Sequence, residues 1–266
     1  DGINPASEQT DLSVLQAARN GQHGKTIWGT METTAEILDM VNVTGAAASV
    51  SEAIHTRHSI RRFDAKPVEQ AKLDAIFTTS LRTPSWKNSQ PWNVHVVTGE
   101  KLKRLARLLT AAALAGELGP DIAWPAVYPA DAKRRMFDLG MKIYGVAGID
   151  RKDKAARDQF MVDNFKFFDA PVGVFITSNF ELNYYVGIDI GCYLQSLMLL
   201  AREQGLGTCP QAALSAMPKI VRAELGLPEE QKVLVGLSLG YPLSEPELNR
   251  YHTPRENYDE KVRFYS

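Results

Sequence analysis

A twenty-residue stretch, Tyr184 to Glu203, limits the possible folds of this chain more than any other segment. Its spacing predicts a helix with apolar side chains on almost every side, and its few polar residues include Asp189, Gln195 and Ser196. A helix that is apolar all round belongs in the centre of a core or at a subunit interface. In a chain of 266 residues we expect this helix to serve as both.

Short apolar runs elsewhere predict the strands of a sheet. They are Asn93–Thr98, Pro171–Thr177 and Lys232–Gly240. Helical spacing predicts further helices over Val68–Leu81, Glu100–Leu118, Asp131–Gly145, Lys154–Phe168 and Met217–Leu225. The tail from Tyr241 shows no clear packed element before Val262. More helix than strand, with strands that are not adjacent in sequence, indicates an α+β fold whose central mixed or antiparallel sheet is flanked by helices.

Aromatic residues are concentrated in the expected helix Lys154–Phe168. We expect them in the core rather than against a ligand, and they are Phe160, Phe165, Phe167 and Phe168.

Three arginines fall within six residues, between Arg57 and Arg62, in the sequence RHSIRR. Guanidinium groups beside a hydroxyl and backbone N–H groups suit a phosphate, because the planar fork donates two hydrogen bonds and carries a full charge. Ser49 and Glu52 form a capping-box pattern, which predicts a short helix ending just before the arginines. The alternative is a basic helix end that faces water, where arginines meet the helix dipole favourably.

Composition makes this local cluster more informative. The chain holds 30 Lys and Arg against 31 Asp and Glu, so it lacks the basic surplus that is usual in nucleic-acid binders. The two cysteines, Cys192 and Cys209, form no C-x-x-C pair, so we expect neither zinc nor a redox dithiol, and a reduced, cytoplasmic setting. We expect no membrane span, because we find no apolar run of roughly 18–20 residues.

Several common chemistries lack their motifs in this sequence. The five histidines form no H-E-x-x-H pattern, and neither a G-x-S-x-G elbow nor a P-loop occurs, so we expect no metal site. The run from Gly205 to Pro210 is not a dinucleotide fingerprint, because it follows a helix and has proline in place of the third glycine.

A second stretch runs from Pro84 to Trp92 with the sequence PSWKNSQPW, and its prolines predict a loop. The amides of Asn88 and Gln90 donate and accept hydrogen bonds at once, which suits the alternating carbonyl and N–H groups of a flavin ring edge. Asn and Ser also favour turns on their own account. The residues alone leave these two interpretations equally weighted.

Together the two stretches resemble the FMN-dependent nitroreductase family. The shared pattern is R-H-S-x-R-x-F over residues 57–63, followed after about twenty residues by the P-S-x-x-N-S-Q-P-W loop. The resemblance continues through Gly205-Leu206-Gly207 and Pro210, the Leu-Gly-Tyr-Pro run of residues 239–242, and Arg255, and it covers about residues 51–264. This chain departs from some members of the family at Thr253, where they have a lysine.

The resemblance implies an intertwined α+β homodimer with one FMN in each of two interface sites. The residues implied at the phosphate and ribityl end, from one subunit, are Arg57, His58, Ser59 and Arg61, with a second phosphate contact from Arg255. The residues implied to reach the same flavin from the other subunit are Pro84, Ser85 and Asn88. Those implied against the ring are Pro210, Gln211, Ala212 and Ala213, with the backbone N–H of Ala212 directed at flavin N5.

The same resemblance divides the chain into an N-terminal extension, residues 1–46, and an FMN-binding domain, residues 47–266. Within the extension, Asp11 and Thr33 each begin a possible short helix. Residues 100–170 would supply a lid that sets substrate choice. Trp86, Trp124 and Tyr128 are candidates for stacking on the substrate, with packing inside the lid as the alternative for the last two.

The implied activity is a ping-pong cycle, in which NADPH or NADH gives hydride to flavin N5 and a nitroaromatic then takes electron pairs, passing through nitroso to hydroxylamine. The flavin carries this chemistry, so the resemblance assigns no catalytic side chain. The same scaffold resembles flavin-dependent reductive dehalogenases and enone reductases, which is one alternative. A non-catalytic FMN-binding protein is the other.

Overall fold

The structure is a computed structural model, and it describes residues 44–266. The chain divides into two units, residues 1–40 and 41–266. The helices expected to begin at Asp11 and Thr33 lie outside the described residues. The boundary between an N-terminal extension and the FMN-binding domain stays a prediction.

A four-stranded antiparallel sheet forms the centre of the described chain. Its strands are β1 (Asn93–Thr98), β2 (Val172–Ser178), β3 (Gly207–Gln211) and β4 (Lys232–Gly240), in the order β1-β2-β4-β3. The three strands expected from the sequence are confirmed. The edge strand β3 was not expected, because a five-residue run containing Pro210 gives no alternating pattern, although proline is tolerated at a sheet edge.

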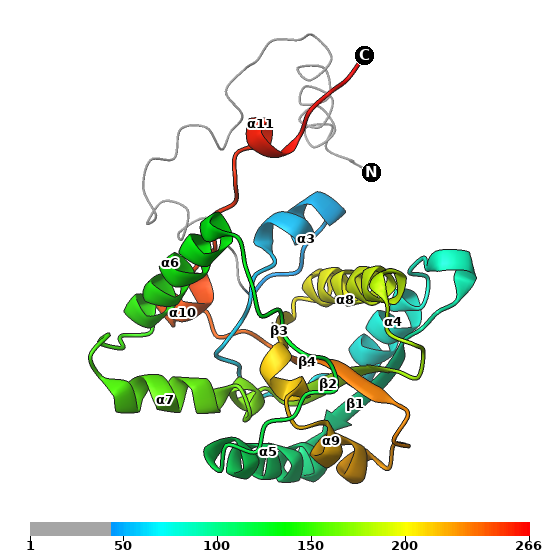
Figure 1. Cartoon of the computed structure of the whole chain (residues 1–266), viewed down its shortest axis with the longest axis vertical. Coiled ribbons are helices and arrows are strands. Elements are labelled where there is room, and N and C mark those ends of the chain that lie inside the picture. The colour runs from blue at the N-terminus through cyan, green and yellow to red at the C-terminus, as the bar shows by residue number, and fades with distance from the viewer. Residues whose placement is uncertain (1–43) are drawn as a thin grey trace, which may run out of the picture. The chain divides into compact units, whose positions relative to one another are not determined.

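Helices cover both faces of the sheet (Figure 1). The helices α5 (Gly99–Leu114) and α9 (Pro218–Leu225) lie on one face, and α4 (Gln70–Ser80) and α8 (Tyr184–Glu203) lie on the other. Every residue of β2 is buried, so this strand separates two apolar cores. Each fully buried Leu, Phe or Val side chain contributes roughly 1.5–3 kcal/mol to the free energy of unfolding.

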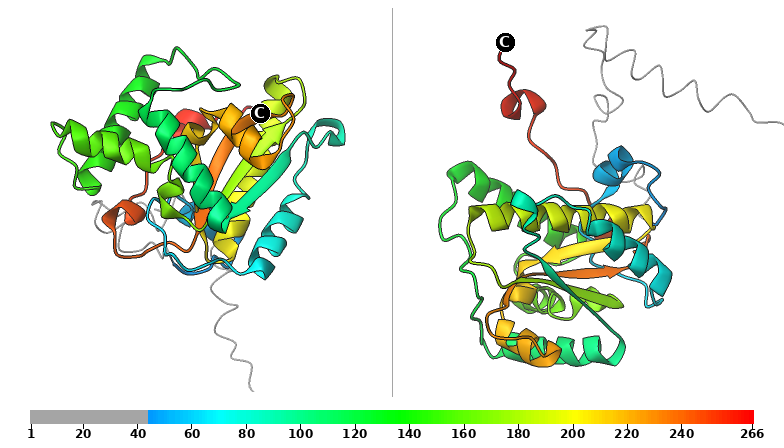
Figure 2. Two further views of the ribbon diagram at one scale, coloured as in Figure 1. Left: turned by 90° about the horizontal axis from the view of Figure 1, so that it is seen from below. Right: turned by 90° about the vertical axis from the view of Figure 1, so that its right-hand side faces the viewer.

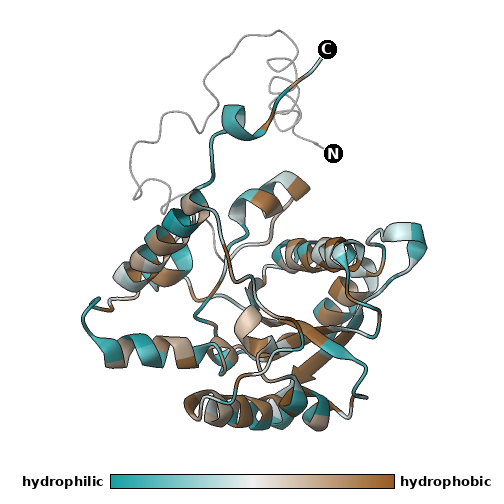
Figure 3. Cartoon of the chain, in the orientation of Figure 1, coloured by the Kyte–Doolittle hydropathy of each residue, from teal (hydrophilic) through white to brown (hydrophobic). Residues whose placement is uncertain are grey.

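The helix α8 agrees with its expected bounds and has two unlike faces. Val186, Tyr193 and Leu197 are buried against the sheet, whereas Tyr185 and Ile188 are exposed. Figure 3 shows brown, apolar positions all along this helix. By length and composition alone α8 could cross a membrane, which is weak evidence because an ordinary core helix meets the same criteria, and the buried face of α8 packs in the core.

The helix expected over Lys154–Phe168 ends early, because α7 spans Lys154–Asp163 and a separate turn, η2, spans Phe167–Asp169. Phe167, Phe168 and Asp169 have positive φ angles of 57°, 51° and 61°. Such angles cost on the order of 1–3 kcal/mol each. Burial of both rings offsets this cost, and the Phe167 ring meets that of Phe175 edge to face at 5.9 Å. The four phenylalanines are buried as expected.

The helices α6 (Ala130–Val146) and α7 lie beside the sheet rather than over its faces (Figures 1 and 2). The tail holds α10 (Glu247–Arg250) and α11 (Tyr258–Lys261). The expectation that the tail has no packed element before Val262 was wrong, since α10 buries Leu248 and Asn249. Four residues are too few to show a helical period.

Candidate functional site

The arginine stretch begins where the short helix α3 (Val50–Thr56) ends. As expected, the Ser49 hydroxyl accepts from the Glu52 N–H at 3.1 Å. The Glu52 carboxylate accepts at 2.8 Å from the N–H of Ala48, one residue before the N–H that a capping box uses. Beyond α3 the chain runs beside β3, where the Ile60 N–H donates to the Thr208 carbonyl at 2.9 Å.

Gly207 permits this close approach. A Cβ atom there would lie only 2.6 Å from Cγ1 of Ile60. The arginine stretch is therefore held against β3 although it belongs to no strand.

Within the described residues, three arginines of this region, Arg57, Arg61 and Arg255, have no carboxylate partner, whereas Arg62 lies near Asp163. Burial, and then the nearby Arg255, lower the pKa of the Arg57 guanidinium, which nevertheless stays charged. Among residues 44–266, no carboxylate lies within 4.0 Å of the guanidinium nitrogens of Arg57, Arg61 or Arg255. Like charges that meet without a carboxylate suit an anionic ligand.

Two histidines complete the cluster. The rings of His58 and His252 lie 3.9 Å apart between centroids. Burial, followed by the neighbouring His58, Arg57 and Arg255, lowers the pKa of His252 to about 3. Within the described chain the buried Nε2 atom of His252 has no hydrogen-bond partner. An orphaned ring nitrogen beside two arginines fits a group that brings negative charge and hydrogen-bonding oxygens, such as the phosphate of FMN.

Thr253, which stands where some members of the family have a lysine, contacts Arg255. Nη1 of Arg255 donates to the Thr253 hydroxyl at 2.6 Å and to its carbonyl at 2.8 Å. The threonine therefore orients the remaining arginine of this segment in place of a second cation.

His58 lies deeper than the arginines. Its Nδ1 faces the carbonyl of Thr56 at 2.8 Å, and its Nε2 faces the carbonyl of Asn249. Burial is the main cause that lowers the pKa of this ring. A phosphate contact from the His58 side chain would have to replace one of these bonds, so that assignment stays a prediction.

The amide loop contains a 3-10 turn, η1 (Trp86–Asn88), and three residues with positive φ: Lys87, Asn88 and Gln90. The Ser85 hydroxyl accepts from the N–H of Gln90 at 2.9 Å, and Asn88 Oδ1 accepts from the Gln90 side chain at 3.2 Å. Ser85 and Asn88 thus hold the loop's own shape, and both remain candidates for contacting the cofactor.

Asp189 in α8 holds this loop through hydrogen bonds. Its carboxylate is buried in α8 and accepts from the Trp86 N–H at 3.1 Å to each oxygen, and from the Ser89 hydroxyl at 3.4 Å. In the sequence, Asp189 stands out only as a polar residue in an apolar helix. That contrast was the available signal for a role in the site.

The arginine cluster and the amide loop lie at opposite ends of α8. Asp189 contacts the loop, whereas Nε of Arg202 lies 3.3 Å from the hydroxyl of Thr56, the residue before the arginines. Thirteen residues of helix separate these two contacts, which is about 20 Å at 1.5 Å per residue. The described chain alone does not bring the two predicted halves of the site together.

The residues expected against the flavin ring follow one another at the end of β3 and in the turn η3 (Ala212–Ser215). Gln211 is buried, and its amide donates to the Asn164 carbonyl at 2.9 Å and accepts from the Ser238 hydroxyl. It therefore joins the sheet to the chain just beyond α7. Of the neighbouring residues, Ala212 is exposed, and Pro210 and Ala213 are partly exposed.

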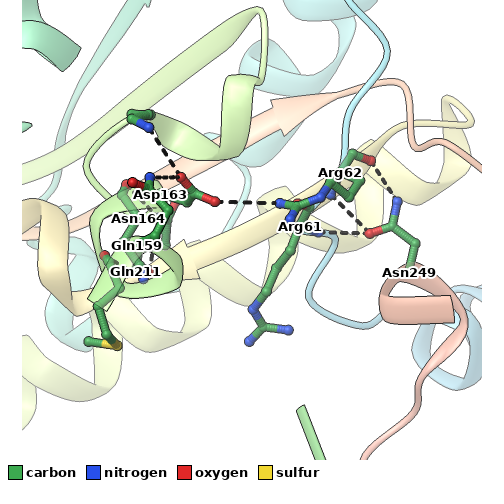
Figure 4. Close-up of polar contacts among 9 residues, drawn as sticks. Arg61, Arg62, Gln159, Asp163, Asn164, Gln211 and Asn249 are labelled. Atoms are coloured by element: carbon green, nitrogen blue, oxygen red, sulfur yellow. Dashed lines mark hydrogen bonds and ion pairs between the residues drawn. The ribbon is translucent and has the colours of Figure 1, made fainter. Parts of the chain in front are cut away.

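Figure 4 shows how this region connects to the arginine stretch. Asp163 at the end of α7 lies 3.8 Å from Nη1 of Arg62 and 3.3 Å from the Lys166 ammonium. On the other side of Arg62, the Asn249 side chain bonds to the backbone. The role of Asn249 was not predicted from the sequence, because a lone Asn in a polar tail gives no signal for it.

The three aromatic candidates for substrate stacking lie in two loops, Trp86 in the amide loop and Trp124 and Tyr128 in the loop before α6. Trp86 is 42% exposed, and its ring meets that of Tyr185 edge to face at 4.2 Å. Trp124 is 48% exposed and Tyr128 is partly exposed, in the loop before α6. Their role in substrate binding stays a prediction. Within residues 44–266, no three His, Cys, Asp or Glu side chains gather as a metal site would require.

Comparison with known proteins gives a consistent result. The model of the Nitroreductase family matches residues 54–241. The 4-nitrobenzoate reductase of Pseudomonas putida is 34% identical over 203 residues, which are 76% of this chain and 89% of that protein. The crystal structure of FMN-dependent nitroreductase NfnB from Mycobacterium smegmatis in complex with NADPH has a TM-score of 0.79 and 30% identity, covering 81% of this chain and 97% of that one. The FMN and NADPH-dependent NfnB from Sphigopyxis sp. strain HMH has the same TM-score and 36% identity, covering 82% and 99%.

Proposed function

This chain belongs to the nitroreductase family, and from that premise we propose that it is an FMN-dependent NAD(P)H oxidoreductase that reduces nitroaromatic compounds. The observation in the molecule that carries the proposal is the cluster of Arg57, Arg255 and His252, where no carboxylate among residues 44–266 pairs with either guanidinium. An FMN phosphate supplies the negative charge that this cluster lacks.

Within the site, we assign the phosphate to the side chains of Arg57, Ser59, Arg61 and Arg255. When bound, FMN supplies the redox chemistry, taking hydride from NADPH or NADH and passing electron pairs to the nitro group. The chain's own residues bind, orient and shield it. Planar guanidinium groups suit this task, because they hold phosphate oxygens in pairs without changing charge.

We assign the second half of each site to a partner subunit. The two predicted halves contact opposite ends of α8, about 20 Å apart, so a second copy of the chain is the simplest way to set an amide loop beside each arginine cluster. In a two-fold dimer the amide loop of one subunit can meet the arginines of the other.

The exposed face of α8 supports such a dimer. Tyr185 and Ile188 are 53% and 45% exposed, which is unusual for large apolar side chains on the central helix of a domain. Gly187 and Gly191 lie one turn apart on the same helix, and a Cβ atom at either would meet nothing within 4 Å in the described chain. Small residues between large apolar ones let a second helix approach closely.

The substrate side of the site is assigned to the loop before α6 and to α6 and α7. Of the wider lid range, residues 100–170, we retain residues 115–163, because α5 packs into the core through Leu105 and Leu109. Trp124 and Tyr128 offer aromatic faces from this region for a flat nitroaromatic ring.

We place the enzyme in the cytoplasm, where nicotinamide cofactors are supplied and free thiols such as Cys192 and Cys209 stay reduced. The two alternatives from the sequence, reductive dehalogenation or enone reduction and FMN binding without turnover, gain no support from a particular feature of the described residues.

The visible absorption spectrum of the purified protein tests this function. We expect two flavin bands that bleach with NADPH or NADH under anaerobic conditions and return when 4-nitrobenzoate is added. A bound flavin that neither nicotinamide reduces would favour the non-catalytic alternative. Faster reoxidation by a halophenol or an enone than by any nitroarene would favour the other.

A further inference from the structure

One side chain from a distant part of the sequence forms hydrogen bonds with the backbone of the arginine stretch. Asn249 lies in α10 and is fully buried, at 0% exposure. Its Oδ1 accepts from the N–H groups of Arg61 and Arg62, at 2.9 and 3.0 Å. Its Nδ2 donates to the carbonyls of Arg62 and Leu243, at 2.6 and 2.8 Å (Figure 4).

These four bonds use the whole capacity of an amide, which has two acceptor positions and two donor hydrogens. The Asn249 backbone adds a fifth contact, because its carbonyl faces Nε2 of His58. One residue therefore holds three members of the stretch, namely His58, Arg61 and Arg62.

The stretch needs such a restraint for two reasons. It runs outside the regular strands, with isolated bridges to β3 at Ser59 and to Pro242 at Phe63. Its Arg57 guanidinium also lies near a second positive charge, Arg255 from the C-terminal tail, which lowers the pKa of Arg57. A flexible segment carrying like charges would spread apart and would lose entropy on binding an anion.

The same bonds determine which donors remain for a ligand. The N–H groups of Arg61 and Arg62 are already occupied by Oδ1 of Asn249, so a phosphate is left with side chains such as Arg61, Ser59 and Arg57. The direction of the Arg61 side chain then follows from a backbone that Asn249 fixes.

We propose that Asn249 is a positioning residue for the FMN phosphate, which pre-organises the backbone of residues 58–62 and does not itself touch the cofactor. The proposal rests on the assignment of FMN to this site. An apolar side chain of the same size would leave two N–H groups and one or two carbonyls buried without partners. An aspartate would keep the acceptor but would set an oxygen against two carbonyls.

The test measures FMN affinity by quenching of flavin fluorescence, together with unfolding in urea, for Asn249→Leu and Asn249→Asp. Thr177→Val is the matched control. Thr177 is also fully buried, and its hydroxyl bonds to Gln231 at 2.8 Å and to His95 at 2.9 Å, but it lies on β2 away from the arginines.

We expect Asn249→Leu to weaken FMN binding by about thirtyfold or more, and Asn249→Asp by about tenfold. Thr177→Val should lower stability yet change FMN affinity by less than about twofold. Hydrogen exchange should show lost protection of the Arg61 and Arg62 N–H groups in Asn249→Leu, which removes their acceptor. If the leucine variant does not fold, the aspartate variant carries the comparison.

Equal FMN affinity in Asn249→Asp and the unaltered protein would overturn the proposal. So would a loss that Thr177→Val reproduces at the same loss of stability, because Asn249 would then act only through global folding. Failure of the unaltered protein to bind FMN is a different result, and it would contradict the proposed function itself.

Discussion

The arginine stretch and the helix α6 show opposite relations between regular structure and fixed position. Residues 57–62 belong to no helix or strand, yet Asn249 and Thr208 bond to the backbone of that stretch. The helix α6 is regular over seventeen residues, yet every one of its side chains is at least partly exposed. Buried hydrogen bonds, rather than regular secondary structure, mark the more rigid of the two regions.

This contrast agrees with the proposed functions of the two regions, cofactor binding by the arginine stretch and covering of the substrate by α6. A cofactor that stays bound benefits from a site that is already in place, because little entropy is lost on binding. Substrates of different shapes benefit from a cover that can adjust. Gly140, in the interior of α6, lowers helix stability by roughly 1 kcal/mol relative to alanine, which suits an adjustable cover.

The largest expected effect comes from adding one methyl group to a glycine of each region. Gly207→Ala should destabilise the protein by about 1–3 kcal/mol, because its Cβ would lie 2.6 Å from Cγ1 of Ile60, and FMN affinity should fall with it. Gly140→Ala should instead stabilise it by roughly 1 kcal/mol and leave FMN affinity unchanged, since its Cβ meets nothing within 4 Å. Urea unfolding and flavin titration measure both. Equal effects of the two substitutions would abolish the contrast between the regions.

A smaller effect should appear in the pH dependence of stability without FMN. The pKa of His252 is about 3 in the folded chain against an ordinary 6.5, chiefly through burial. Between about pH 3 and pH 6.5 the His252 ring is protonated in the unfolded chain but stays neutral in the folded chain. The free energy of unfolding therefore falls as pH decreases from 6.5 towards 3. Burial also lowers the pKa of His58, which acts in the same direction.

Bound phosphate should make this fall shallower, because negative charge beside Arg57 and Arg255 favours the protonated ring. His252→Gln should remove part of the slope in the protein without FMN. Urea unfolding at about pH 7 and about pH 5, with and without FMN, checks the sign. A slope that neither FMN nor His252→Gln changes would place the effect elsewhere.

Much of the contrast could be predicted from the sequence, but not its physical basis. Apolar runs gave β1, α8 and β4 with their observed bounds. The arginines of the RHSIRR stretch were singled out because charge is visible in a sequence.

The partner that holds the arginines was not visible. Asn249 acts on Arg62 from 187 residues away, and a pairing at that separation leaves no local pattern. The early end of α7 was missed for a related reason, since burial of Phe167 and Phe168 in the core overrides their helical spacing. Local propensity is a weak guide wherever tertiary packing decides.

The smallest expected effect on the cofactor comes from the adjustable region. Trp124→Ala should leave flavin content unchanged, because the ring is 48% exposed in the loop before α6. It should raise the KM for 4-nitrobenzoate by about three- to tenfold, if the ring stacks on the substrate. Steady-state kinetics of the FMN-loaded protein gives the value. A Trp124→Ala variant that loses flavin but keeps its KM for 4-nitrobenzoate would show that Trp124 contributes to cofactor binding rather than to substrate binding.

The central claim is that each site joins the arginines of one subunit to the amide loop of the other. Mixed dimers of Arg57→Ala and Asn88→Ala chains, purified through two different tags, test it most directly. The account predicts weak FMN binding in both homodimers and about half of the normal flavin content in the mixed dimer, since one of its sites keeps both intact halves. A mixed dimer that binds FMN no better than the two homodimers would show that each site is built within one chain, and would contradict the account.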